Sequence, residues 1–232
     1  MSEPSYALFL SLFLGARHAL EPDHLAALST MLTTAPKRPA ALGIFWGAGH
    51  ALALCAVATV LALLERELPP AWSSRAELLV ALLLVFLGVR TVWLVWAAFW
   101  QGRQGVCRLH HHGDARHRHL GPEKHVHVGS LTLAQQPLLV GLLHGLAGSG
   151  ALSALCAAQM PTVPLRILYA ALFGLGAMLA MGAVLGVLGQ SFCRLISTRP
   201  AITQVLTLVA GLLSLVLGLF WGFPHLLGLF HD

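Results

Sequence analysis

The sequence predicts an all-α membrane protein in which six transmembrane helices form two inverted repeats of three. Three observations favour this fold class. First, 57% of the 232 residues are hydrophobic and only 10% are charged, whereas soluble domains carry about 25% charged residues. Second, six apolar segments are each long enough to cross a bilayer, which takes roughly 20 residues. Third, the two halves of the chain carry related short motifs in the same order.

The six apolar segments are predicted to be helices, because the lipid interior offers backbone groups no hydrogen-bond partners. They lie near Tyr6–Met31, Ala40–Leu64, Leu78–Trp100, Leu133–Cys156, Leu165–Leu188 and Ile202–Phe223. Three helices then fall in residues 1–100, a loop covers residues 101–130, and three helices fall in residues 131–232. We expect no cleavable signal peptide, because no basic region precedes the first segment, so that segment should stay in the protein.

Basic residues between the segments predict the orientation of the chain. The first, third and fifth loops carry nine of them: Lys37, Arg38, Arg103, Arg108, Arg116, Arg118, Lys124, Arg194 and Arg199. The loops on the other side carry only Arg66, Arg75 and Arg166. The positive-inside rule therefore places the nine, and with them the long third loop, in the cytoplasm. Both termini are then outside, and the expected location is the cell's inner membrane.

Related motifs recur with a nearly constant offset of 126 to 130 residues. The pairs are GARHAL at 15–20 with GLLHGL at 141–146, GAGHALA at 47–53 with GLGAMLA at 174–180, and FLG at 86–88 with VLG at 216–218. Each half would hold three helices, and an odd number makes the second half enter the membrane from the opposite side. Transporters built from such inverted repeats bind their substrate near the midplane, between the repeats.

The stretch GARHALEPDHLAAL at 15–28 places charged groups inside the first apolar segment. A charged side chain at the bilayer centre costs about 2.5 to 3.5 kcal/mol on insertion scales, so something must compensate for Glu21 and Asp23. Arg17 and Glu21 are four residues apart and can pair on one helix face. Asp23 is left over, next to His24 and five residues after His18.

Pro22 makes this spacing usable for binding a metal ion. On an unbroken helix His18 and His24 would point about 120° apart. Proline removes an N–H and interrupts the helix, which can turn His18, Asp23 and His24 toward one cavity and leave the His18 carbonyl free. The alternative is a kinked helix that contains a buried salt-bridge network without a metal.

Two more histidines lie in other apolar segments, His50 in WGAGHAL and His144 in GLLHGLAGSG. Each by itself could be a hydrogen-bonded core histidine. Together with His18, Asp23 and His24 they make a mixed nitrogen and oxygen set without thiolate, which suits nickel or cobalt and does not exclude zinc. Ser149 and Ser153 could complete a polar lining.

The third loop is dense in histidine. It holds His110, His111, His112, His117, His119, His125 and His127. Tracts of this kind bind metals loosely, so a flexible cytoplasmic metal reservoir or sensor is predicted rather than the transport site. The alternative is a basic, solvated linker. Glycines and a proline in the loop argue against a long helix.

Other features exclude some classes of function. The net charge of +5 comes from the loops and does not indicate nucleic-acid binding. The four cysteines are scattered and form no C-x-x-C pair, which argues against a dithiol carrier. The chain has no G-x-x-x-x-G-K-[ST] phosphate loop, so ATP is not expected to drive it.

Arg90, within the third segment, could balance an acidic residue or snorkel to the interface, and the sequence leaves this open.

RHALEPDHLAAL at 17–28 resembles the signature of the nickel/cobalt transporter superfamily, the NiCoT and NicO proteins. His18, Asp23 and His24 match its three polar positions. WGAGHALAL, with His50, resembles the Gly-His pair in the next helix of the family, and GLLHGLAGSGALSAL resembles a segment of its UreH-like branch. Glu21 and Pro22 stand where many members have Asp-Ala, and classical members have eight spans. The His-rich loop resembles those of exporters in the superfamily.

The resemblance and the residues together predict a transporter for nickel, with cobalt as a second substrate and uptake as the favoured direction. His18, Asp23 and His24 are the expected main ligands, with Glu21, His50 and His144 completing the site. No resident cofactor is expected, and a cytoplasmic metallochaperone is a candidate partner. The alternatives are a nickel or cobalt exporter, a non-transporting metal donor for urease maturation, and a membrane metal hydrolase. The sequence does not indicate the oligomeric state.

Overall fold

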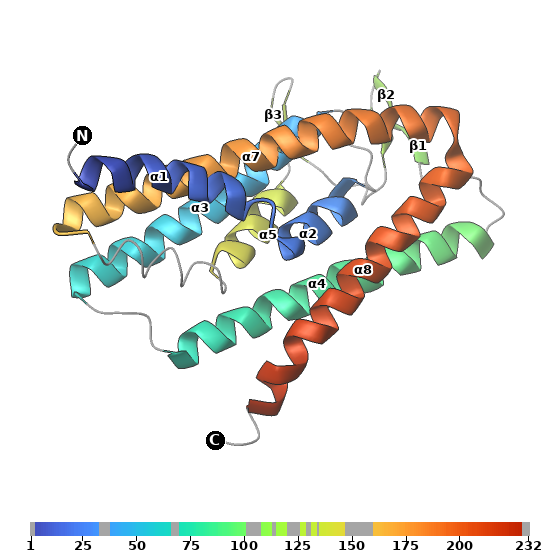
Figure 1. Ribbon diagram of the computed structural model, residues 1–232. Helices are drawn as coiled ribbons and strands as arrows, with labels where there is room; N and C mark the ends of the chain where they lie inside the picture. The colour runs from blue at the N-terminus through green and yellow to red at the C-terminus, as the bar shows by residue number, and fades with distance from the viewer. Residues whose placement is uncertain are drawn as a thin grey trace.

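The computed structural model describes residues 3–32, 38–65, 70–100, 108–112, 115–119, 126–128, 131–133, 135–146 and 160–228. These residues form seven helices and four short strands (Figure 1). The prediction of an all-α fold is confirmed for the body of the molecule. The strands lie only in the segment that joins α4 to α5.

Four of the helices are long and apolar enough to cross a membrane. They are α3 (Pro39–Leu64), α4 (Pro70–Trp100), α7 (Val163–Thr198) and α8 (Pro200–Gly228). They match the second, third, fifth and sixth predicted segments, and three of their ends, at Pro70, Thr198 and Gly228, lie several residues beyond the predicted ones. Proline begins α3, α4 and α8, where its fixed φ suits a helix and its missing N–H would have had no partner.

The first predicted segment is two helices, α1 (Glu3–His18) and α2 (Pro22–Leu32). At 1.5 Å per residue, α1 is about 24 Å long and α2 about 16 Å, so each is shorter than the apolar core of a bilayer. The interruption expected at Pro22 is present. The expected free carbonyl is not, because the backbone N–H of Glu21 donates to the His18 oxygen over 3.0 Å.

Helix α5 (Gln135–Gly145) is a third helix too short to cross the bilayer. It follows two antiparallel hairpins, in which β1 (Arg108–His112) pairs with β2 (Ala115–His119) and β3 (Val126–Val128) pairs with β4 (Leu131–Leu133). The fourth segment was predicted to begin as a helix at Leu133, but that residue ends β4. The backbone register places the Cα of His110 opposite that of His117.

Helices α1 and α7 cross at close range because glycines line both sides of the contact. A Cβ on Gly15 would collide with the backbone oxygen of Phe173, and a Cβ on Gly176 would collide with the backbone oxygen of Leu12. Small residues at such positions allow the two backbones to approach, which is how helices associate in lipid. This contact fixes where the C-terminal end of α1, with His18, sits against α7.

Helices α3 and α5 cross in the same manner. A Cβ on Gly49 would meet the backbone oxygen of Leu138, and a Cβ on Gly141 would meet that of Trp46. The glycine of each helix thus faces the backbone of the other. This contact holds the last turn of α5, which carries His144, against the middle of α3, which carries His50.

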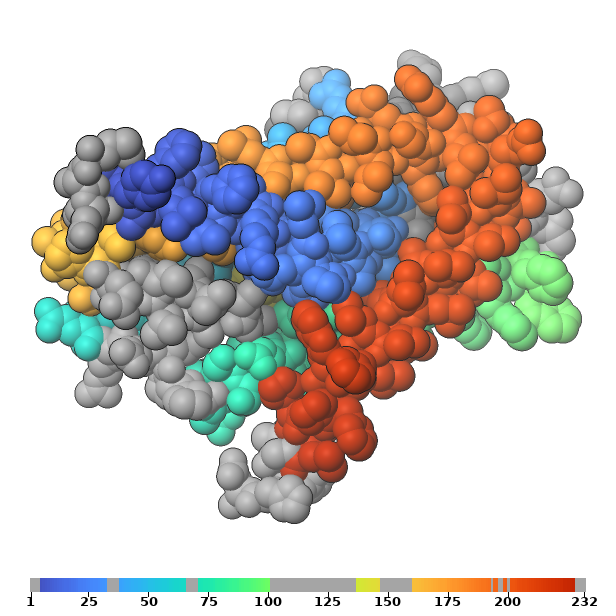
Figure 2. Space-filling model, viewed as in Figure 1, coloured from blue at the N-terminus to red at the C-terminus, as the bar shows by residue number. Residues whose placement is uncertain are grey.

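The short helices fill the space between the long ones. Figure 2 shows α1 and α2 as a continuous blue band, in which α1 lies along α7 and α2 reaches α8. Helices α4 and α8 pack along each other and cross below the other helices in Figure 1. The buried core joins α2, α3, α4 and α7 through residues that include Leu28, Trp46, Leu84, Met181 and Leu185. The break between α1 and α2 lies beside this core.

Candidate metal site

Five polar side chains predicted to belong to one site lie together and are buried. His18 ends α1, Asp23 and His24 stand in the first turn of α2, His50 is in the middle of α3, and His144 is in the last turn of α5. His24 and His50 are fully buried, and none of the five is more than 5% exposed. The cluster therefore combines residues from four helices and from both halves of the chain.

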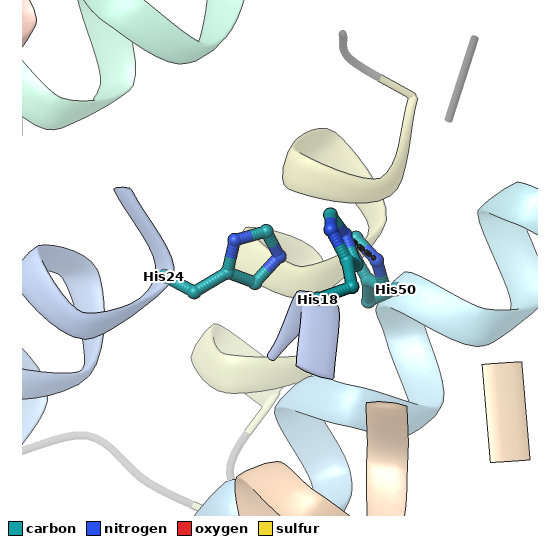
Figure 3. A group of neighbouring side chains, drawn as sticks. All are labelled: His18, His24 and His50. Carbon is teal, nitrogen blue, oxygen red and sulfur yellow. Dashed lines mark hydrogen bonds between the residues drawn. The ribbon is translucent and has the colours of Figure 1, made fainter. Parts of the chain in front are cut away.

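The rings of His18, His24 and His50 face one another (Figure 3). The Nε2 atoms of His18 and His50 are 3.2 Å apart, and the ring of His24 points toward this pair. One ring nitrogen from each of the three lies within 4.8 Å of the others. Two ligand nitrogens about 2.1 Å from one ion are about 3.0 to 3.4 Å apart in octahedral or tetrahedral geometry. The His18–His50 separation falls in that range.

Asp23 joins two of the rings. Its Oδ1 atom lies 3.0 Å from Nδ1 of His24, and its Oδ2 atom lies 2.9 Å from Nε2 of His144. An ionised carboxylate only accepts hydrogen bonds, so both ring nitrogens donate to it. Asp23, His24 and His144 form a second group with one potential ligand atom each within 4.8 Å. His24 belongs to both groups.

Glu21 is held by His18, whose Nδ1 atom lies 3.0 Å from the Glu21 carboxylate. The expected pair between Glu21 and Arg17 is not among the ion pairs of the described residues. The helix ends at His18, so the four-residue spacing no longer brings Arg17 and Glu21 together. The Glu21 side chain is 39% exposed, and it therefore lies at the edge of the cluster.

Helix ends contribute to the electrostatics of the cluster. Helices α1 and α5 both end beside it, and the dipole of a helix gives its C-terminal end a partial negative charge that favours a cation. Helix α2 begins there with the opposite polarity, which Asp23 in its first turn offsets. Two C-terminal ends and one carboxylate thus make the buried region suited to positive charge.

Several buried polar atoms of the cluster have no hydrogen-bond partner within the described part of the chain. They are Nε2 of His24, Nδ1 of His50, Nδ1 of His144 and Nε1 of Trp46. A buried polar group without a partner costs about 1 to 3 kcal/mol. Four such atoms at one place are a feature of a site that binds something, since a structural core normally satisfies its polar groups.

Two aromatic residues that the sequence analysis did not single out pack against the rings. Trp46 lies with its ring centroid 5.5 Å from those of both His24 and His144, and Phe173 lies 5.4 Å from that of His18. Trp46 precedes His50 by four residues, and this one-turn spacing on a helix was the signal in the sequence. These rings form apolar walls beside the cluster.

The structure describes only some of the remaining predicted residues. Ser149, Ser153 and His125 lie outside the described residues. The other histidines of the third loop are placed only through the backbone of the hairpins. Arg90 is partly exposed on α4, and the described ion pairs of Asp23 and Glu21 involve histidines instead.

Comparison with known proteins gives matches over nearly the whole chain. A family described as NicO, high-affinity nickel-transport protein, matches residues 6–230. The urease accessory protein UreH of Bacillus sp. (strain TB-90) is 28% identical over 214 residues, which cover 91% of this chain and 88% of that protein. The chloroplast protein FOR GROWTH AND FERTILITY 2 of Arabidopsis thaliana is 27% identical over 213 residues, 89% of this chain but only 53% of that protein. No solved structure gives a significant match.

Proposed function

Because the chain belongs to the NicO family of nickel-transport proteins, we propose that it carries Ni²⁺ across the membrane through the buried histidine cluster. Cobalt is the second proposed substrate, since imidazole ligands suit both ions. Family membership also supports a transporter rather than an enzyme, which argues against the metal hydrolase considered from the sequence.

The observation that carries this proposal is the convergence of four imidazoles and one carboxylate in a buried place. His18, Asp23, His24 and His50 come from the first half of the chain and His144 from the second. Groups of this kind are expensive within a membrane and are retained where they bind ions or substrates. A site between two halves of the chain is also where transporters with repeats bind their cargo.

The crossings of the short helices support an inverted repeat. Gly15 and Gly141 are equivalent in the repeated motifs, and so are Gly49 and Gly176. Gly15 and Gly176 line the α1–α7 crossing, whereas Gly141 and Gly49 line the α5–α3 crossing. The same reciprocal contact therefore occurs twice, each time between a short helix of one half and a long helix of the other.

The crossing of α4 with α8 follows the same rule. A Cβ on Gly88 would lie 2.7 Å from the backbone nitrogen of Leu215, and a Cβ on Gly218 would lie 2.8 Å from that of Val85. Gly88 precedes Gly218 by the same number of positions (218 − 88 = 130) as Val85 precedes Leu215 (215 − 85 = 130). If the two halves are exchanged, the contact of Gly88 with Leu215 therefore becomes the contact of Gly218 with Val85. A two-fold axis in the membrane plane that relates the two halves requires this symmetry.

We propose six crossings of the membrane, four made by the long helices and two that include the short ones. Helices α1 and α2 together make the first crossing, and α5 begins the fourth. Broken helices of this kind are tolerated in lipid where their ends face a protein-lined site. The two halves would then move around the ion and open it to each side in turn.

Uptake into the cell is the proposed direction. An inside-negative potential is worth about 2.3 kcal/mol per charge per 100 mV, so a divalent ion gains roughly 5 kcal/mol on entry. The distribution of basic residues supports an inner-membrane protein with both termini outside and the His-rich loop in the cytoplasm. The loop would there hold ions that have crossed.

The test is the flux of radioactive Ni²⁺ into liposomes that contain the purified protein. We expect entry that depends on the protein, rises when a potassium gradient with valinomycin makes the interior negative, and does not require a pH gradient. Flux that appears only with an opposing proton gradient would instead indicate an exporter. In cells, uptake raises and export lowers the nickel content on expression.

One observation favours a second candidate. The relative from Bacillus sp. bears the name urease accessory protein and is similar over 91% of this chain. A non-transporting membrane protein that passes nickel to a cytoplasmic metallochaperone during urease maturation would fit that name. It would bind Ni²⁺ in detergent but give no flux in the same liposomes.

A further inference from the structure

The hydrogen bonds of Asp23 determine which nitrogens of two rings are available to an ion. Nδ1 of His24 and Nε2 of His144 both donate to the carboxylate, over 3.0 and 2.9 Å. A neutral imidazole carries one N–H, so its other nitrogen holds a lone pair. The lone pairs are therefore on Nε2 of His24 and Nδ1 of His144, and these two atoms are among those without a partner.

Glu21 has the same relationship to His18. Its carboxylate accepts from Nδ1 of His18 over 3.0 Å, which leaves the lone pair of that ring on Nε2. This Nε2 atom lies 3.2 Å from Nε2 of His50. Glu21 and Asp23 thus face one side of the rings of His18 and His24 and leave the opposite nitrogen of each, Nε2, directed to the space shared with His50.

From these contacts we propose that Asp23 and Glu21 orient the rings and do not bind the ion, which is held by Nε2 atoms of His18, His24 and His50. The inference rests on the proposed function and divides the roles within that site. It differs from the expectation that Asp23 is itself a ligand.

The energetics favour this division. Each Asp23 oxygen already accepts one hydrogen bond, so an ion could reach only its remaining lone pair. The positive charge of that ion would repel the ring N–H of His24 or His144 and weaken its hydrogen bond in a buried place. Such charge-assisted bonds are among the stronger ones in proteins. Nε2 of His24 has no partner to give up. At His18 and His24 an incoming ion therefore meets imidazole lone pairs at lower cost than carboxylate oxygens, and at His50 it displaces the proton that Nε2 donates to His18.

This arrangement sets the class of ion. Three imidazoles favour nickel, cobalt, zinc and copper, whereas magnesium and manganese prefer carboxylate, carbonyl and water ligands. Carboxylates that hold ligand histidines in this way fix their orientation and make them better donors. Asp23 also ties α2 to α5 through His144, so the same residue links the ligand rings to the second half of the chain.

The first measurement uses the unaltered protein in detergent, loaded with Ni²⁺. X-ray absorption spectroscopy counts imidazole ligands from their multiple-scattering features, and we expect three. A site with fewer than three imidazoles would overturn the proposal. Because no variant is involved, this result does not depend on the folding of an altered chain.

The second measurement compares Asp23→Asn, Asp23→Glu and His24→Ala, with Co²⁺ as an optical probe and Ni²⁺ for affinity. We expect Asp23→Asn to bind about 10- to 100-fold more weakly, the range for losing a residue that orients a ligand, while its visible cobalt spectrum and imidazole count remain those of the unaltered protein. Asp23→Glu should recover part of the affinity. His24→Ala should change the spectrum and lose one imidazole. A changed ligand set in Asp23→Asn, or unchanged affinity, would overturn the proposal.

Glu77→Gln is the matched control, because Glu77 also pairs with a histidine, His225, over 3.0 Å but lies outside the cluster. It should bind like the unaltered protein. The proposed transport and the proposed ligands can be tested separately. Binding by three imidazoles without flux would refute transport but support the ligand assignment. Flux with a carboxylate in the ligand set would support transport but refute the ligand assignment.

Discussion

The Nε2 atoms of His18 and His50 lie 3.2 Å apart although the residues are 32 positions apart in the chain and belong to different helices. The two rings are nearly stacked, with centroids 5.2 Å apart, and both are buried. Because Nδ1 of His18 donates to Glu21, Nε2 of His50 is the donor in this contact. A cation held by both Nε2 atoms would displace that proton, and protons should therefore compete with the ion.

Replacing either of these histidines with alanine should abolish nickel transport. His18→Ala and His50→Ala each remove one of the facing nitrogens and leave the other ring without its partner. Uptake of radioactive nickel by expressing cells, corrected for the amount of protein in the membrane, measures the effect. His225→Ala, which removes a histidine at the end of α8, should transport normally. Normal flux in either cluster variant would contradict the site.

Adding one methyl group at Gly141 should damage both stability and binding. A Cβ there would collide with the backbone of Trp46 and push α5 away from α3, moving His144 from Asp23. Overpacking of this kind costs about 1 to 3 kcal/mol. Thermal unfolding in detergent and Ni²⁺ affinity report the two effects for Gly141→Ala.

The matched control for that change is Gly186→Ala in α7. Its added Cβ would come no closer than 3.3 Å to the Cβ of Ala40 and 3.9 Å to the Cα of the same residue, so it would not collide with the backbone. We expect a much smaller loss of thermal stability and unchanged affinity. Equal losses in the two variants would mean that the α3–α5 contact has no special role.

Trp46 should tolerate phenylalanine but not alanine. If the two halves are related as proposed, the contact of Trp46 with His144 is equivalent to the contact of Phe173 with His18. The ring centroids are 5.5 Å apart in the first contact and 5.4 Å apart in the second. Trp46→Phe keeps an aromatic wall and removes an indole N–H that lacks a partner. Its transport should stay near normal, whereas Trp46→Ala should lose about 3 to 5 kcal/mol of stability through the cavity it leaves.

Deleting residues 108–128 should leave transport through the buried site largely intact. The hairpins of this segment are separate from the cluster in sequence, and their histidines are proposed to hold ions after crossing. Initial rates of nickel entry should be unchanged, while the amount of nickel bound to the protein at saturation and its regulation in cells should change. A deletion variant that folds, reaches the membrane and has lost its initial rate would refute the reservoir role.

Local patterns in the sequence predicted many of the residues that lie together in the cluster. Charged and imidazole groups inside an apolar segment are costly enough to indicate a buried site, and Pro22 indicated where the helix would be interrupted. The structure places His18, Asp23 and His24 together at that interruption. The reciprocal glycine contacts fall at positions that the repeated motifs made equivalent, although the repeat itself remains a proposal.

Expectations that assumed continuing helix geometry were wrong. Glu21 pairs with His18 and not with Arg17, because the helix stops at His18 and the four-residue rule does not extend past its end. The His18 carbonyl is occupied because the backbone makes a tighter turn there. The start of the fourth segment was also misplaced, since apolar residues at 131–133 suit a strand as well as a helix.

The sequence by itself determined that this chain belongs in a membrane, which residues are too costly to be there by chance, and where the first helix breaks, because each of these follows from the chemistry of neighbouring residues in lipid. Only the tertiary structure decided that Asp23 bonds to His144, 121 positions away, and that Trp46 covers the rings. Those contacts depend on how closely helix backbones approach at their crossings. The spacing of residues along one helix does not determine that distance.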